Sequence, residues 1–141
     1  MAEFHNPDTI WQPFGAFSMM VIEGAGRTVR LKGQVSLDVS GKIVGANDMQ
    51  AQVRQVFSNI ETVLSSVGGQ MCDVIELVHS TTDIDAFMQT GDIRQHYFSA
   101  PYPITTTVEV AKLYDPNLVI EITATAEIPL DRFVAPEKQA R

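Results

Sequence analysis

The sequence predicts a single α+β domain in which one β-sheet carries two helices on one of its faces. Runs with apolar side chains at every second position lie near both ends of the chain, and this is the period of a half-buried strand. A run with apolar side chains three and four positions apart lies between them, as in an amphipathic helix. At 141 residues the chain has the length of one domain with its own core. The predicted order of elements is ββαβαββ.

The N-terminal part is predicted to be an irregular lead-in followed by a β-hairpin. Residues 1–13 contain two prolines and an asparagine, which favour turns, and the domain itself is expected over residues 14–130. Residues 17–22 form a short buried strand that ends at a glycine-containing turn. Residues 28–37 alternate between apolar and polar side chains. We expect these two strands to pair with each other.

The first helix is expected to begin at Asn47 or Asp48 and to end at Gly68. Asparagine and aspartate are preferred helix caps, and glycine adopts the left-handed conformation at a helix end at low cost. The apolar side chains between these residues are spaced as one wide stripe: Val53, Val56, Phe57, Ile60, Val63, Leu64 and Val67. This stripe is expected to cover the sheet.

A short strand over residues 74–78 and a second helix are expected next. The helix begins at Thr82 or Asp83 and is stopped by Pro101, with Gly91 inside it at a cost of about 1 kcal/mol relative to alanine. Its inward side chains include two aromatic residues near its end.

Two strands, over residues 105–113 and 118–128, are expected to close the domain before a polar tail over residues 131–141, whose last six residues should fray. Polar side chains share one face of each strand: Thr105, Thr107 and Glu109 in the first, and Glu121, Thr123, Thr125 and Glu127 in the second. The sheet face without helices is therefore expected to be rich in threonine and aliphatic side chains. Such a face is typical of contacts between subunits, and it predicts a symmetric homo-oligomer.

Composition excludes several classes of function. The net charge of −7 and the absence of a basic run disfavour a nucleic-acid-binding surface. No stretch is apolar enough to span a membrane, and the first residues do not resemble a signal peptide, so a cytoplasmic protein is expected. The single cysteine, Cys72, cannot form an internal disulfide and is expected to be a small buried residue. The three histidines lack the spacing of metal ligands, so neither a metal nor another cofactor is expected.

Five segments in order resemble the RidA/YjgF family of reactive intermediate deaminases. They are 15–18 (GAFS), 31–34 (LKGQ), Asn59 to Leu64 with Asp73-Val74, 103–110 (PITTTVEV) and 121–126 (EITATA). The resemblance covers residues 15–128 and implies a chorismate-mutase-like fold. It also implies a homotrimer that binds small molecules in clefts between adjacent subunits.

The resemblance also assigns substrate-binding positions, most of which carry a changed side chain here. Threonine stands at Thr105 in place of the arginine that binds a substrate carboxylate, and at Thr123 in place of the glutamate that orders the attacking water. The backbone N–H of Gly33 is implied to polarise the substrate. A phenylalanine replaces a tyrosine at Phe17, and Thr107 is implied to line the cleft. A threonine offers one neutral hydrogen bond where arginine offers a charged bidentate pair, so the usual substrates should bind less tightly.

Other residues could restore the missing chemistry, and each has a structural alternative. Lys32 is a candidate catalytic residue, as a replacement cation or an amine that attacks a carbonyl; the structural alternative is a solvated or ion-paired lysine. Arg94 could restore the positive charge in the cleft or face solvent. Glu121 could position water, and Glu76 or Glu109 could act as an acid or base or pair with a cation. The histidines are expected to be surface or capping residues, His79 being the best acid–base candidate among them.

Two functions remain open. The first is enamine or imine hydrolysis of a specialised substrate in the clefts between subunits, with ammonia as a product. The second is a non-catalytic trimer that binds or senses a small ligand. A ribonuclease activity, sometimes assigned to relatives, is disfavoured by the acidic charge.

Overall fold

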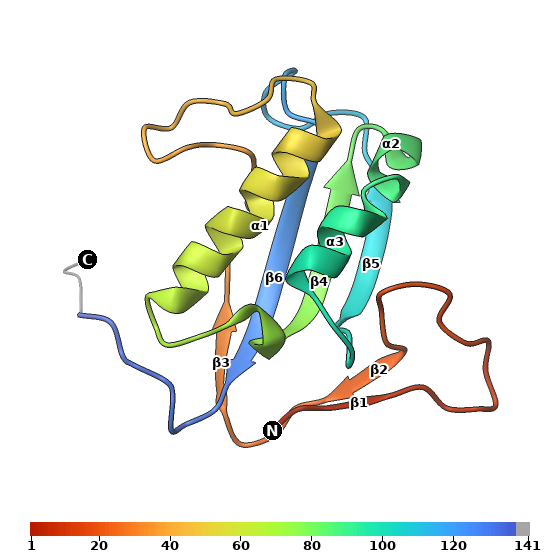
Figure 1. The fold of residues 1–141 in the computed structure, drawn as a ribbon, viewed down its shortest axis with the longest axis vertical. Coiled ribbons are helices and arrows are strands. Elements are labelled where there is room, and N and C mark those ends of the chain that lie inside the picture. Colours follow the sequence, from red (N-terminus) through yellow and green to blue (C-terminus); the bar gives the residue numbers. More distant parts are fainter. Residues whose placement is uncertain (138–141) are drawn as a thin grey trace.

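The computed structural model describes residues 1–137 and confirms a single α+β domain in which helices cover one face of a sheet (Figure 1). Six strands, three α-helices and one short 3₁₀ helix follow one another along this part of the chain. Their bounds are β1 (Glu3–His5), β2 (Met20–Ile22), β3 (Arg27–Arg30), α1 (Met49–Ser65), η1 (Met71–Asp73), β4 (Val74–Thr81), α2 (Ile84–Met88), α3 (Gly91–Tyr97), β5 (Ile104–Glu109) and β6 (Ile120–Ile128).

The main sheet has the strand order β3-β6-β4-β5. β6 runs antiparallel to both of its neighbours, whereas β4 and β5 are parallel. Parallel strands need a crossover connection, and here α2 and α3 supply it. Leu77 of β4 lies opposite Thr105 on one side and Ala124 on the other, so these side chains share the face covered by helices. Thr105 and Thr107 therefore lie on the helix side of the sheet, and the prediction that they belong to the face without helices is wrong.

The core lies between α1 and the sheet, as the apolar stripe predicts. Val53, Val56, Phe57, Ile60 and Leu64 are fully buried, while Val63 is 41% exposed because it lies at the edge of the stripe. The Asp48 side chain accepts a hydrogen bond from Ala51 N at 3.1 Å and caps the helix. Gly68 has a φ of 80°, which is the left-handed conformation expected after the helix end.

The predicted N-terminal hairpin is wrong. β2 pairs with β1, which lies in the lead-in that was expected to be irregular, and β3 pairs with β6. The regular strand also stops at Arg30, although the following segment stays beside β6 through Leu31 N to Ala124 O at 3.0 Å. Alternation of side chains fixes which face a strand buries, but it does not fix which strand lies beside it.

The second predicted helix is two helices. Asp83 caps α2 by accepting a hydrogen bond from Ala86 N, as expected. The chain then breaks at Gln89 and Thr90, and Gly91 is the first residue of α3 rather than an interior one. Glu109 accepts a hydrogen bond from Ile84 N at 3.0 Å, so its carboxylate serves as a structural partner of α2.

Two further expectations need correction. Cys72 is exposed and not buried, because it lies in the short η1 turn ahead of β4. His79 is neither a surface nor a capping residue but is 1% exposed inside β4. Of the predicted tail, residues 138–141 lie outside the described part, while Arg132 donates two hydrogen bonds to Asp73 and one to the carbonyl of Gly68. None of the helices described is long and apolar enough to cross a membrane.

Candidate functional site

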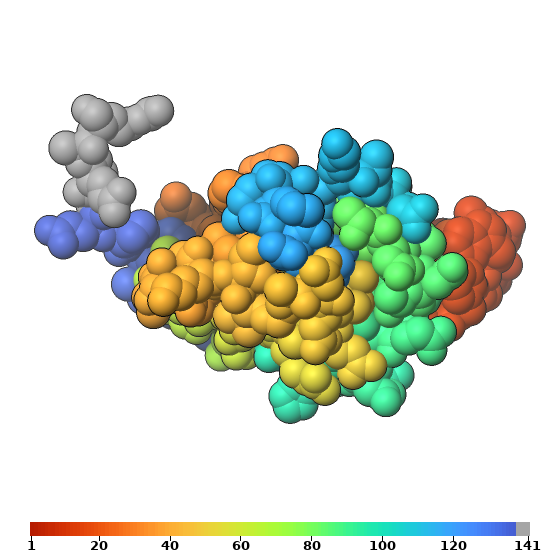
Figure 2. Space-filling view, turned by 90° about the horizontal axis from the view of Figure 1, so that it is seen from above, coloured from red at the N-terminus to blue at the C-terminus, as the bar shows by residue number. Residues whose placement is uncertain are grey.

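A cavity of about 390 Å³ lies between the N-terminal segment, the α2–α3 pair and β5. Figure 2 shows the N-terminal segment, in red, against the green α2–α3 region. Four of the residues expected in the substrate site line this cavity together, namely Phe17, Arg94, Thr105 and Thr107. The other lining residues are Phe14, Gly15, Ala16, Ile84, Met88, Gly91 and Gln95. We call it the Arg94 cavity.

The Arg94 side chain carries an unneutralised positive charge into this cavity. Within residues 1–137 it forms no ion pair, and its buried Nε atom has no hydrogen-bond partner. Its guanidinium carbon lies 5.1 Å from the centre of the Phe87 ring, a cation–π distance. Burial lowers the pKa of Arg94, because removal from water disfavours the charged form. A partly buried cation without a protein anion is suited to binding an anionic ligand.

A buried histidine supports one wall of the Arg94 cavity. His79 Nδ1 lies 2.8 Å from the Thr107 hydroxyl, and the imidazole contacts the Phe87 ring at a centroid distance of 4.8 Å. Burial, and secondarily the charge of Arg94, lowers the pKa of His79 to about 3. The imidazole is therefore neutral at pH 7. Its Nδ1 atom can form the hydrogen bond with the Thr107 hydroxyl in either tautomer, as donor or as acceptor.

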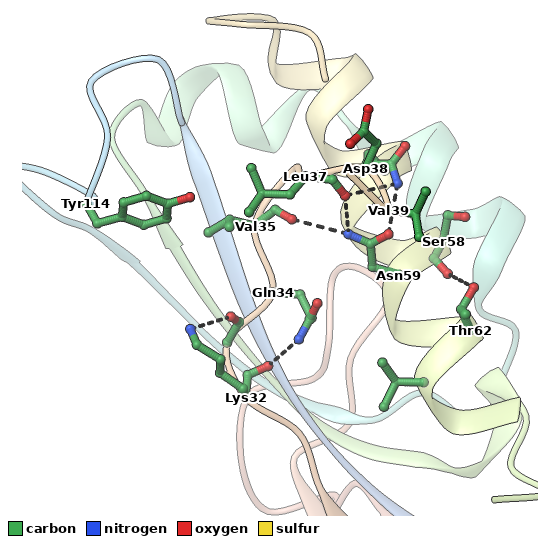
Figure 3. Close-up of a pocket in the computed structure, with 13 residues that line it drawn as sticks. Lys32, Gln34, Val35, Leu37, Asp38, Val39, Ser58, Asn59, Thr62 and Tyr114 are labelled. Carbon is green, nitrogen blue, oxygen red and sulfur yellow. Dashed lines mark hydrogen bonds between the residues drawn. The ribbon is translucent and has the colours of Figure 1, made fainter. Parts of the chain in front are cut away.

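Lys32 and Gly33 line a different hollow, a groove of about 650 Å³ between α1 and the segment that precedes it (Figure 3). We call it the Lys32 groove. Lys32 is exposed, and its ammonium donates to the carbonyl of Gly33 at 3.3 Å. No carboxylate pairs with it in the described part of the chain. Asn59 of α1 donates to the carbonyls of Val35 and Leu37 and so fixes the wall of the groove.

Glu121 lies against Gly33. A side chain at position 33 would collide with the Glu121 carboxylate, so the close approach requires glycine. Thr123 lies two residues further along β6, on the sheet face that the helices leave open, and borders neither hollow. Lys32 and Gly33 thus form a second group with Glu121 and Thr123, which belong to the neighbouring strand β6.

The two groups lie near opposite edges of the sheet. The segment of Gly33 continues the line of β3 along β6, through Gln34 N to Ile122 O at 2.8 Å, and Thr105 lies in β5 at the other edge. Three strand spacings separate them, roughly 14 Å at about 4.8 Å per spacing. Figure 1 shows β3 and β5 on the two sides of the sheet. A single copy therefore does not bring all of the expected residues into one site.

Comparison with known proteins identifies the family. The family model described as Endoribonuclease L-PSP matches residues 9–128, which is most of the chain. This chain belongs to the RidA/YjgF family. The match includes Thr105 and Thr123, where the resemblance expected arginine and glutamate, so the family assignment does not depend on those side chains.

Relatives and solved structures agree with this assignment. A 2-iminobutanoate/2-iminopropanoate deaminase from Dermatophagoides farinae is 29% identical over 83% of this chain and 89% of its own. A RutC family protein from Pyrococcus horikoshii is 30% identical over 82% and 89%. The Rid-family protein YyfB from Yersinia pestis, whose function is unknown, has a TM-score of 0.81 at 32% identity, covering 90% of this chain and 98% of that one. RidA from a Psychrobacter species has a TM-score of 0.67 at 28% identity, covering 89% and 99%.

No group of three or more potential ligands among histidine, cysteine, aspartate and glutamate lies together in residues 1–137. Among the candidate acid–base residues, His79 was predicted at the surface but is buried. The signal was present, because His79 continues the buried alternation of Ile75 and Leu77 along β4.

Proposed function

We propose that this protein hydrolyses a small imine or enamine that carries an anionic group, with Arg94 as the residue that binds the anion. The observation that carries the proposal is the unpaired guanidinium of Arg94 in the same cavity as Thr105. The family resemblance places a carboxylate-binding arginine at position 105. Here the positive charge enters the cavity from α3 instead of β5, and the threonines leave room for it.

The reaction consists of water addition followed by loss of ammonia. Water attacks the carbon of the C=N bond while the nitrogen gains a proton, which gives a tetrahedral carbinolamine. The C–N bond then breaks, ammonia leaves and a carbonyl remains. A general base is needed to orient the water, and a hydrogen-bond donor is needed to stabilise the developing charge.

In the proposal, the group formed by Lys32, Gly33 and Glu121 supplies the general base and the hydrogen-bond donor. The Glu121 carboxylate orients the water, and the backbone N–H of Gly33 donates to the substrate. Their contact supports this pairing, because Gly33 allows the carboxylate to approach the backbone. Lys32 remains a candidate for a second positive charge, since it is exposed beside Gly33.

We place the complete site between copies of the chain. The Arg94 cavity lies at the β5 edge of the sheet, whereas Glu121 lies in β6 beside the segment that continues β3. In the proposal, the β5 edge of one copy therefore meets the β3 side of the next. Such head-to-tail contacts close into rings, and a homotrimer is the ring proposed here. The open sheet face supports it, because β5 presents Val108 there with 43% of its side chain exposed.

The test uses Arg94→Gln, with Arg94→Lys as the conservative variant. Each is assayed for ammonia and pyruvate release from freshly generated 2-aminoacrylate. Losing a charge-assisted hydrogen bond of about 1.5–3 kcal/mol should lower kcat/KM about ten- to a hundredfold, with part of the activity kept by lysine. The matched control is Arg54→Gln, because Arg54 is an exposed arginine on α1, outside the Arg94 cavity. Equal activity in wild type and Arg94→Gln would remove the proposed role.

The second candidate function is a trimer that binds a small anion without catalysis. The observation that favours it is Thr123, which stands where the resemblance expects the water-ordering glutamate. This alternative predicts no ammonia release above buffer, together with a thermal stabilisation by small carboxylic acids that Arg94→Gln abolishes.

A further inference from the structure

Three aromatic side chains pack together at the Arg94 cavity, and two of them line it. Phe14 and Phe17 line the cavity, with ring centroids 5.2 Å apart at an interplanar angle of 81°. Trp11 lies 5.9 Å from Phe14 at 25° and 6.0 Å from Phe17 at 60°. Yet Phe14 is 80% exposed and Trp11 57% exposed. We call these three residues the aromatic cluster.

The aromatic cluster is held in place independently of its own contacts. Ser18 follows Phe17 directly, and its backbone N–H donates to the carbonyl of Pro103 at 3.0 Å, next to the start of β5. Its hydroxyl donates to the carbonyl of Tyr102. Met19 N donates to the Asn6 side chain at 2.8 Å. These hydrogen bonds anchor the chain directly after Phe17, and the rings of Trp11 and Phe14 pack against the Phe17 ring.

The Arg94 cavity has the size of a small-molecule site. Its volume of about 390 Å³ lies within the roughly 300–1,000 Å³ that is typical of ligand pockets. Gly91 adds to this space, because a Cβ atom placed there meets nothing within 4 Å. Ile84 and Met88 supply further apolar wall. An anion held by Arg94 thus leaves unfilled apolar volume between Arg94 and the aromatic cluster.

We infer that the Arg94 cavity selects substrates in which the anionic group is joined to a flat aromatic body. Arg94 binds the anion, and the rings of Phe14 and Phe17 contact the aromatic body by stacked or edge-to-face packing. This inference rests on the proposed function for its reaction, but the choice of ligand is a separate property of the cavity. The rival occupant of the aromatic cluster is a second copy of the chain.

The experiment measures binding of stable acids to the full chain by calorimetry. Phenylacetate is compared with propionate, which lacks the ring, and with phenylacetamide, which lacks the charge. Wild type should bind phenylacetate at least about tenfold more tightly than propionate, and Arg94→Gln should weaken both acids. Trp11 is the single tryptophan of the chain, so its fluorescence should change with phenylacetate and not with propionate.

Two variants test the aromatic contact, and a third is the matched control. Phe14→Leu should weaken phenylacetate about two- to tenfold and leave propionate unchanged. Gly91→Leu should fill the cavity and exclude phenylacetate while propionate still binds. Leu130→Ala removes an exposed apolar side chain outside both the Arg94 cavity and the Lys32 groove and should change neither affinity. Equal affinities of wild type for the two acids would overturn the inference, as would phenylacetate binding that neither Phe14→Leu nor Gly91→Leu alters.

An activity measurement separates this inference from the proposed function. Imines are generated in situ from phenylalanine or alanine by an added amino-acid oxidase, and ammonia release is followed. Faster hydrolysis of the aromatic imine, abolished by Gly91→Leu, supports both proposals. Hydrolysis without aromatic preference overturns the inference alone. Selective phenylacetate binding without any hydrolysis overturns the enzymatic function and leaves the ligand class standing.

Discussion

The buried His79 makes the folded protein unusually sensitive to acid. Burial, and then the charge of Arg94, lowers its pKa to about 3, against 6.5 for a free histidine. Between these values the unfolded chain binds a proton that the folded chain does not, so stability is complete above pH 6.5 and falls as the pH drops toward 3. The loss from His79 is about 2 kcal/mol at pH 5 and approaches roughly 5 kcal/mol at pH 3.

The measurement compares urea unfolding of wild type and His79→Leu at pH 7 and pH 5, at one protein concentration. Acidic residues contribute to the pH dependence of both proteins, so the difference between the two proteins isolates His79. We expect His79→Leu to gain about 2 kcal/mol relative to wild type on going from pH 7 to pH 5. The control, His96→Leu, removes an exposed histidine and should keep the wild-type dependence. The same pH dependence in wild type and His79→Leu would refute the reasoning.

Two further substitutions test other parts of the structure. Gly33→Ala should displace the Glu121 carboxylate and lower the rate of imine hydrolysis at least about tenfold. The unfolding midpoint should change little, because the Glu121 side chain can rotate away. Steady-state kinetics and urea unfolding measure the two effects, and unchanged kinetics would show that Glu121 takes no part in the reaction. Arg132→Ala should destabilise the fold by about 2 kcal/mol, because the 5% exposed Asp73 side chain loses its charged partner and the Gly68 carbonyl loses a donor at 3.0 Å. An unfolding midpoint equal to that of the exposed Arg54→Ala control would contradict the Arg132 prediction.

The sequence predicted the central helix well because its signals are local. Asp48 caps α1, Gly68 adopts the left-handed conformation after it, and most of the apolar stripe is buried. The partner of each strand is not a local property. The segment of β2 is as apolar as a core strand, yet it pairs with β1 outside the main sheet. Nothing in its alternation distinguishes the two positions.

The candidate site shows the same division. The period of β5 predicts correctly that Thr105 and Thr107 share a face, and both line one cavity, but that face is the one covered by helices and not the open one. The side of α3 on which Arg94 lies depends on the break at Gln89 and Thr90, because the backbone of α3 does not continue the helix of α2. Thr90 is the N-cap of α3, but its hydroxyl donates to a backbone carbonyl of α2 and forms no capping hydrogen bond. The apolar spacing in the sequence continues across this break, so the sequence left open whether Arg94 faces the cavity or solvent.

Mixing two inactive variants tests most directly whether the site forms between copies. Arg94→Gln damages one group of residues and Glu121→Gln the other, and the two chains are co-purified as mixed assemblies. If each site takes Arg94 from one copy and Glu121 from the next, about one site in four in a random mixture contains both intact residues. We therefore predict recovery of about a quarter of the wild-type rate of ammonia release. A mixture that stays as inactive as its components, although shown to contain both chains in one assembly, would contradict the account.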